Sequence, residues 1–200
     1  MRHRVGMARR PTPSAGPAPT AATLRERALA HLARYAATEA GLARVLARGV
    51  DRWARRALAD GADTEQVATQ AAAARATVRG VVTQLAAAGA VSDVAFAESR
   101  ARSLLRGGRS RRAVAAHLVA KGVGAETAKA VLETGENDEL SAALVLARRR
   151  RIGPFREAEE DRKRELAMLA RAGFNQDVAS RALRMGRDEA EAIVLQLRRS

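Results

Sequence analysis

The sequence contains no cysteine and no long apolar segment, and each absence excludes a class of protein. Without cysteine there is no disulfide scaffold and no metal site built from thiolates. No stretch approaches the roughly 18 uncharged apolar residues that a membrane-spanning helix needs. The first 22 residues are basic and lack the apolar run of a secretory signal. We therefore expect a cytoplasmic protein that does not enter a membrane.

Aromatic residues are also scarce, and alanine supplies much of the apolar content. Hydrophobic residues form 47% of the chain, but its only aromatic residues are Tyr35, Trp53, Phe96, Phe155 and Phe174. Because alanine buries little area, each packed unit must be thin and stabilised by its neighbours. The scarcity of aromatic rings also argues against a stacking platform for the bases of a single strand.

Positive charge is what the chain has in excess, with a formal net charge of +14. Arginine outnumbers lysine 33 to 3, a bias that a GC-rich genome would produce together with the excess of alanine. Such a bias exchanges one cation for another and leaves the net charge unchanged. The excess therefore indicates a partner that carries phosphates or an acidic surface.

The distribution of proline and glycine divides the chain into an arm and a helical region. Residues 1–22 hold four of the five prolines and no acid, which predicts a disordered basic arm. No proline lies between Thr20 and Gly153, and apolar residues recur there at helical spacing. Helices are expected to end at glycines in the left-handed conformation, namely Gly49, Gly89, Gly122, Gly135, Gly173 and Gly186. The expected N-caps are Asp63, Ser92, Ser110, Asn137 and Asn175.

An internal repeat divides the helical region into modules. Residues 117–132 align with residues 168–183, and the alignment pairs Leu118 with Leu169, Gly122 with Gly173, Val123 with Phe174 and Leu132 with Leu183. The predicted fold is all-α, with tandem three-helix, helix-turn-helix-like modules in an elongated, curved array. The predicted divisions are a disordered arm at 1–22, an extended first module at 23–90, a second module at 91–135, a third module at 136–185 and a closing helix at 186–200.

No arrangement of residues typical of an enzyme is present. The histidines His3, His31 and His117 have no metal-ligand or nucleophile partner at a useful spacing. There is no phosphate-binding glycine loop with a lysine, and residues 122–124 lack the preceding strand that a dinucleotide site needs. We therefore expect a protein that is not an enzyme, with no catalytic residue, no cofactor and no metal.

Two basic clusters supply the candidate binding residues. The first, residues 100–112, contains no acid and spans a helix end, a Gly107-Gly108 break and the next helix start. Guanidinium groups around such a turn can follow a phosphate backbone or bind carboxylates bidentately. The second closes a helix before Gly153-Pro154, where four successive arginines exceed what the helix dipole requires. With Lys121, the candidate contact residues are Arg100, Arg102, Arg106, Arg109, Arg111, Arg112, Lys121, Arg148, Arg149, Arg150 and Arg151.

The central stretch, residues 89–123, resembles the RecX family of regulators of the RecA recombinase. The family pattern is a glycine, an acid, an aromatic-Ala-Glu group, paired arginines and a Lys-Gly-apolar ending. This chain has, in that order, Gly89, Asp93, Phe96-Ala97-Glu98, Arg111-Arg112 and Lys121-Gly122-Val123. Residues 169–183 are similar to the family's basic-Gly-Phe turn and the helix that follows it. The resemblance covers roughly residues 23–185, although the first module is stretched and its pattern is faint.

The resemblance implies a function that composition alone does not supply. It implies binding in the groove of the RecA–single-stranded DNA filament, where the protein bridges neighbouring subunits and meets DNA through its phosphate backbone. It also implies inhibition of ATP hydrolysis and strand exchange and a tempered SOS co-protease activity. Both arginine clusters would then face the filament. We expect the protein to act as a monomer.

Two alternatives stay open. One is a nucleoid or transcription-type DNA-binding protein of helix-turn-helix-like units without sequence specificity. Against it, the helix expected at 125–133 carries Glu126 and Glu133 with a single Lys129, and a recognition helix with net negative charge would approach phosphates unfavourably. The other is an RNA- or ribosome-associated protein, which only the charge supports.

Overall fold

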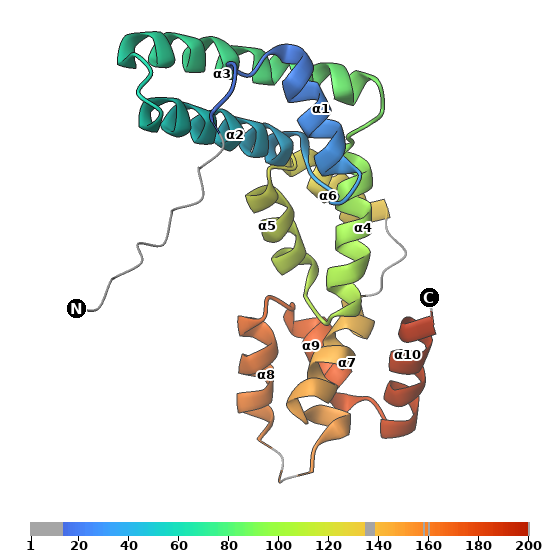
Figure 1. Cartoon of the computed structure of the whole chain (residues 1–200). Coiled ribbons are helices and arrows are strands. Elements are labelled where there is room, and N and C mark those ends of the chain that lie inside the picture. Colours follow the sequence, from blue (N-terminus) through green and yellow to red (C-terminus); the bar gives the residue numbers. More distant parts are fainter. Residues whose placement is uncertain (1–13, 135–138, 158, 160, 200) are drawn as a thin grey trace, which may run out of the picture. The chain divides into compact units, whose positions relative to one another are not determined.

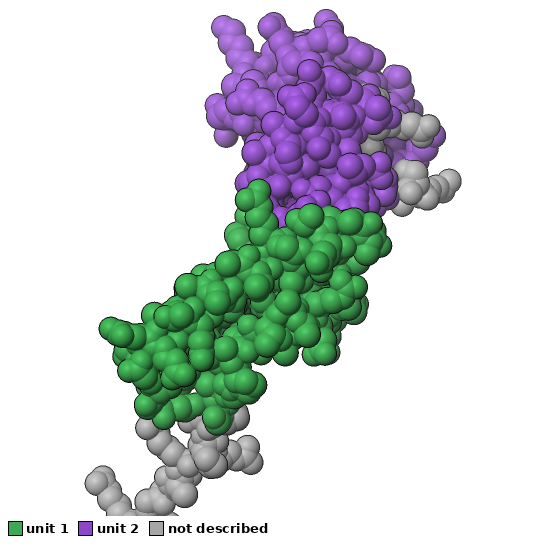
Figure 2. Space-filling view, turned by 90° about the horizontal axis from the view of Figure 1, so that it is seen from above, with its two compact units in different colours: residues 1–35, 42–90 green, residues 36–41, 91–200 purple. Residues whose placement is uncertain are grey.

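The computed structural model describes residues 14–134, 139–157, 159 and 161–199, which form helices and no strand (Figure 1). This confirms the predicted all-α class. The chain divides into two compact units (Figure 2). Unit 1 comprises residues 1–35 and 42–90, and unit 2 comprises residues 36–41 and 91–200.

Unit 1 contains three helices, α1 (Ala21–Leu32), α2 (Glu39–Ala59, of which the first three residues group with unit 2) and α3 (Thr64–Ala87). Leu24 of α1, Leu46 of α2 and Leu85 of α3 are at most 2% exposed and form part of its core. Four buried residues of α3 are valines and two are alanines, so small side chains fill much of its buried face. The second and third helices are long, with 21 and 24 residues.

The prediction that a helix ends at Gly49 is wrong. Gly49 is buried in the middle of α2, because the apolar residues at Leu42, Leu46, Val50 and Trp53 continue one buried stripe past it. The local resemblance of residues 44–50 to a helix end is therefore overridden by the packing of the whole helix.

The segment before α1 lies against α2. The indole Nε1 of Trp53 donates a hydrogen bond to the carbonyl of Gly16 at 3.1 Å. Helix α1 begins at Ala21, two residues before the predicted start of the first module. The predicted disorder of the arm concerns mainly residues 1–13, which lie outside the described residues.

Unit 2 holds the remaining helices around one continuous core. They are α4 (Asp93–Arg106), α5 (Arg111–Lys121), α6 (Ala125–Thr134), α7 (Glu139–Arg150), the short 3-10 helix η1 (Gly153–Phe155), α8 (Arg162–Arg171), α9 (Gln176–Arg184) and α10 (Arg187–Arg199). Helix α7 contacts α4, α9, α10 and η1, and seven of its 12 residues are buried. The predicted boundary at residues 135 and 136 lies outside the described residues, so the division into second and third modules stays a prediction.

The predicted internal repeat is visible in the packing of α5–α6 and α8–α9. Gly122 and Gly173 both follow the first helix of their pair in the left-handed region, with φ of 100° and 94°. The paired apolar residues occupy equivalent core positions, all at most 8% exposed: Leu118 with Leu169, Val123 with Phe174, and Leu132 with Leu183. The same helix-glycine-helix arrangement therefore occurs twice in unit 2.

Most of the predicted helix ends are confirmed. Asp63, Ser92, Ser110 and Asn175 each accept a backbone N–H through the side chain at a helix start. Gly89 is left-handed after α3, whereas Gly186 is not left-handed and instead precedes α10. Asn137 and Gly135 lie outside the described residues.

Close contacts through small residues join α4–α6 to α7–α9. A Cβ added to Gly108 would lie 3.0 Å from the backbone nitrogen of Leu146 in α7. The fully buried Ser110 hydroxyl donates to the carbonyl of Ala172 at 2.8 Å and accepts from the N–H of Ala113 at 3.2 Å. Glycine at 108 thus allows the turn after α4 to touch the backbone of α7.

Residues 36–41, predicted within the first module, group with unit 2. The buried Thr38 hydroxyl donates to the carbonyl of Lys121 at 2.7 Å, and the N–H of Glu39 donates to Oδ1 of Asp93 at 2.8 Å. These bonds tie the start of α2 to the end of α5 and the start of α4.

Candidate polyanion-binding surface

Four basic side chains of unit 2 gather where α4 and α5 lie side by side. We call Arg100, Arg109, His117 and Lys121 the His117 cluster. Nε of Arg100 donates to Nε2 of His117 at 3.3 Å, which joins the two helices and requires a neutral imidazole. Lys121 follows His117 by four residues and therefore shares its face of α5. Three of the predicted contact residues are thus brought together by a histidine that the sequence did not mark as functional.

The electrostatics around His117 reflect the three cations that lie near its imidazole. Partial burial lowers the pKa of His117, and the positive charges of Arg100, Lys121 and Arg109 lower it further. The segment 99–125 itself contains no acid. A site of this kind attracts an anion, because an anion would relieve the repulsion among the cations.

The remaining residues of the first basic cluster lie elsewhere. Successive helical residues turn by about 100°, so Arg102 and Arg106 lie about 200° and 240° round α4 from Arg100. Both are exposed. Arg112 is exposed at the start of α5, whereas Arg111 is partly buried and its N–H donates to Oε1 of Glu139 at 3.2 Å. The run 100–112 therefore forms at least two surfaces.

The second basic cluster closes α7. Arg148, Arg149 and Arg150 are exposed in its last turn. Arg151 follows in the left-handed region with φ of 55°, where its N–H bonds to the carbonyl of Arg148, and Nη1 bonds to Oε2 of Glu157 at 3.2 Å. All four arginines are thus exposed, three in the last turn of α7 and the fourth directly after it.

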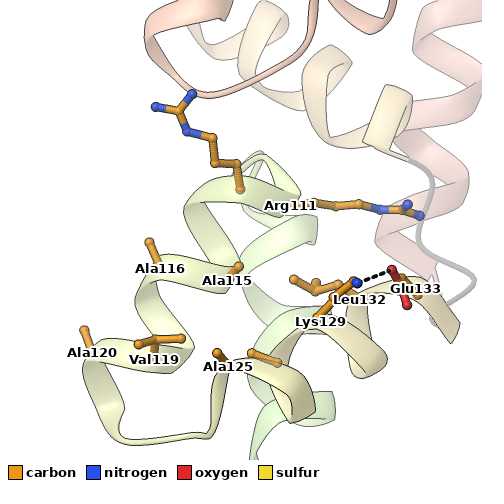
Figure 3. Close-up of a pocket in the computed structure, with 11 residues that line it drawn as sticks. Arg111, Ala115, Ala116, Val119, Ala120, Ala125, Lys129, Leu132 and Glu133 are labelled. Carbon is orange, nitrogen blue, oxygen red and sulfur yellow. Dashed lines mark ion pairs between the residues drawn. The ribbon is translucent and has the colours of Figure 1, made fainter.

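An apolar groove of about 680 Å³ lies between α5 and α6 (Figure 3). Ala115, Ala116, Val119, Ala120 and Leu132 line it, with Arg112 at one end and a Lys129–Glu133 pair at 3.9 Å on the α6 side. The groove could not be predicted from the sequence, because alanines on an exposed helix face are also common as ordinary helix formers. The residues that line the groove include no serine, threonine or histidine.

Among residues 14–134, 139–157, 159 and 161–199, no group of three His, Asp or Glu side chains could hold a metal ion. Within the same ranges, no helix has the length and hydropathy to cross a membrane.

Comparison with known proteins places the chain in a family. Residues 92–132, which span α4–α6 and the His117 cluster, match the family model of the RecX second three-helix domain. The chain is 42% identical over 166 residues to the regulatory protein RecX of Myxococcus xanthus, covering 80% of this chain and 83% of the relative. It is 42% identical over 108 residues to the regulatory protein RecX of Agrobacterium fabrum, covering 52% and 58%. It is 39% identical over 103 residues to that of Mycobacterium marinum, covering 50% and 60%. Because the first of these relatives is similar over most of both chains, the chain belongs to the RecX family of regulatory proteins.

Proposed function

We propose that this protein binds the RecA–single-stranded DNA filament and modulates, mostly by inhibition, its ATPase, strand-exchange and SOS co-protease activities. The observation that carries the proposal is the His117 cluster, a concentration of positive charge inside the domain that matches the family model. A filament of protein and DNA presents phosphates and acidic side chains to such a surface. The partners are then RecA and the phosphate backbone of single-stranded DNA, and the protein acts as a monomer.

Helix α6 does not support the alternative of a DNA-reading helix-turn-helix protein. Its exposed charges are Glu126, Lys129 and Glu133, and Lys129 pairs with Glu133. Such a helix has net negative charge, which opposes insertion into a groove lined by phosphates. Docking on a protein–DNA assembly requires no such insertion.

The first experiment measures the ATPase activity of RecA on single-stranded DNA while this protein is titrated in at two salt concentrations. We expect inhibition well below one copy per RecA that persists at the higher salt. Binding that rests on six to ten phosphate contacts alone loses roughly 10³–10⁵ in affinity between 50 and 200 mM salt. Inhibition only at amounts that coat the DNA would contradict the proposal and favour general DNA binding.

A charge-matched pair of variants locates the surface. The triple variant Arg100→Gln, Arg109→Gln, Lys121→Gln removes three charges from the His117 cluster and should weaken inhibition with helicity unchanged. The control variant Lys163→Gln, Arg171→Gln, Arg184→Gln removes three exposed charges from α8 and α9. Equal inhibition by the two variants would remove the His117 cluster from the contact surface.

A further inference from the structure

Helix α2 of unit 1 carries a row of arginines opposite its buried stripe. Arg48, Arg52 and Arg55 are all exposed, whereas Leu46 and Trp53 on the other side of the helix are buried. With a rise of about 1.5 Å per residue, the three arginines extend over about 10 Å of the helix. The row was not among the contact residues predicted from the sequence.

An arginine of α1 joins this row above Gly49. A Cβ placed on Gly49 would lie 3.9 Å from Nη1 of Arg27 and 3.9 Å from Nη2 of Arg52, and from no other neighbouring side chain or backbone atom within 4 Å. Two guanidinium groups from different helices therefore converge on the space that glycine leaves open. We call Arg27, Arg48, Arg52 and Arg55 the arginine ridge.

The charge of the ridge is not compensated within unit 1. Over residues 14–35 and 42–90 as the structure describes them, no ion pair engages any of its four arginines. The nearby Asp51 is already bound by Arg75 of α3, with Nη2 and Oδ1 2.6 Å apart. Asp60 accepts the backbone N–H of Ala15, and Asp63 accepts that of Gln66 at the start of α3. Convergent cations whose neighbouring acid is already paired attract a ligand that is itself an extended anion.

The chemistry of the ridge favours a phosphodiester backbone. Guanidinium groups bind phosphate oxygens bidentately, and several in a row can follow successive phosphates. Trp53 is buried beneath the ridge, so no aromatic ring is exposed on this face of α2 for base stacking. We propose that the arginine ridge is a second DNA-backbone site, separate from the His117 cluster and independent of RecA. The protein thereby holds DNA with both of its units.

The test measures binding of the full chain to a fluorescent 30-nucleotide oligo-dT by anisotropy, without RecA, at several NaCl concentrations. The ridge variant is Arg48→Gln, Arg52→Gln, Arg55→Gln, and glutamine preserves helix propensity. Each phosphate contact contributes about 0.7 to the slope of log K against log salt for a single strand, so the slope should fall by about 2. A 30-base-pair duplex tested in parallel shows whether the phosphates of one strand or of two are preferred.

A charge-matched control separates a site from a net-charge effect. The variant Arg25→Gln, Arg34→Gln, Arg79→Gln removes three exposed arginines of the same unit that lie off the ridge. We expect its slope to change by less than half as much. The proposal would be overturned if the slope changed equally in both variants or did not change in the ridge variant. Binding to polyglutamate serves as a second probe, and a ridge variant that lost binding to polyglutamate but kept binding to DNA would also overturn the proposal. Because RecA is absent from this assay, its result is independent of the filament function proposed above.

Discussion

Replacing Gly173 with alanine should destabilise unit 2 by about 3 kcal/mol. Gly173 has φ of 94°, and a residue with a Cβ pays about 1–2 kcal/mol in the left-handed region. The new Cβ would also lie 2.6 Å from Oγ of Ser110, which is fully buried and forms two hydrogen bonds. Displacing that hydroxyl costs about 1–2 kcal/mol, because each such bond contributes about 1 kcal/mol net.

Urea unfolding followed by circular dichroism measures this loss, with Gly186→Ala as the matched control. A Cβ at Gly186 meets nothing within 4 Å and its φ is not positive, so the control should lose only the roughly 1 kcal/mol or less that alanine costs in place of glycine at the N-cap of α10. Midpoints for the two variants that agree within error would refute the reasoning.

A double-mutant cycle separates the two contributions. Ser110→Ala alone removes the N-cap of α5 and the bond to the Ala172 carbonyl, at a cost of about 1–2 kcal/mol. In the double variant the added Cβ no longer meets Oγ, and only the backbone strain at residue 173 is left. The double variant should therefore lose at least about 1 kcal/mol less than the sum of the two single variants. Strict additivity would mean that the two residues are not coupled.

Two further predictions concern unit 2. Arg151→Gly should raise the melting temperature through a gain in stability of about 0.5–1 kcal/mol, because glycine adopts φ of 55° without strain and the exposed ion pair with Glu157 contributes little. The control variant Arg150→Gly places glycine inside α7 and should lower the melting temperature. His117 has a lowered pKa in the folded protein, so below the unfolded value of 6.5 the unfolded chain binds more protons and stability falls as the pH falls. The urea midpoints measured at pH 7.5 and 6.0 should therefore differ less for His117→Gln than for the parent chain. An equal difference in both proteins would contradict the attribution of this pH dependence to His117.

The ends of helices were predictable because they depend on local chemistry. Ser92, Ser110 and Asn175 cap helices with their own side chains, and a short stretch of sequence contains all that such a cap needs. Gly49 was misread because the same glycine signal occurs inside a helix whose buried stripe runs past it. The role of Gly108 was not predictable, since glycine is required there by close contact with the backbone of α7, nearly 40 residues away in the sequence.

The candidate surface was predictable as charge but not as geometry. Residues 100–112 form one basic run in the sequence, yet the turn of α4 separates Arg100 from Arg102, and Arg100 instead meets His117 on α5. The arginine ridge was missed for the opposite reason. Arg27 lies on α1, far from the other three in the sequence. The three members on α2 are separated by two or three other residues, so no continuous basic run marks them.

The burial of α7 on nearly every side has a consequence for how unit 2 opens. Because α7 contacts α4 as well as α9 and α10, its removal would expose apolar faces of helices that precede it and helices that follow it. A fragment cut before α7 would therefore lose part of the core that α4–α6 need. We expect the slowest amide hydrogen exchange of unit 2 in α7, with the flanking helices protected to a similar free energy, as a single cooperative unit requires.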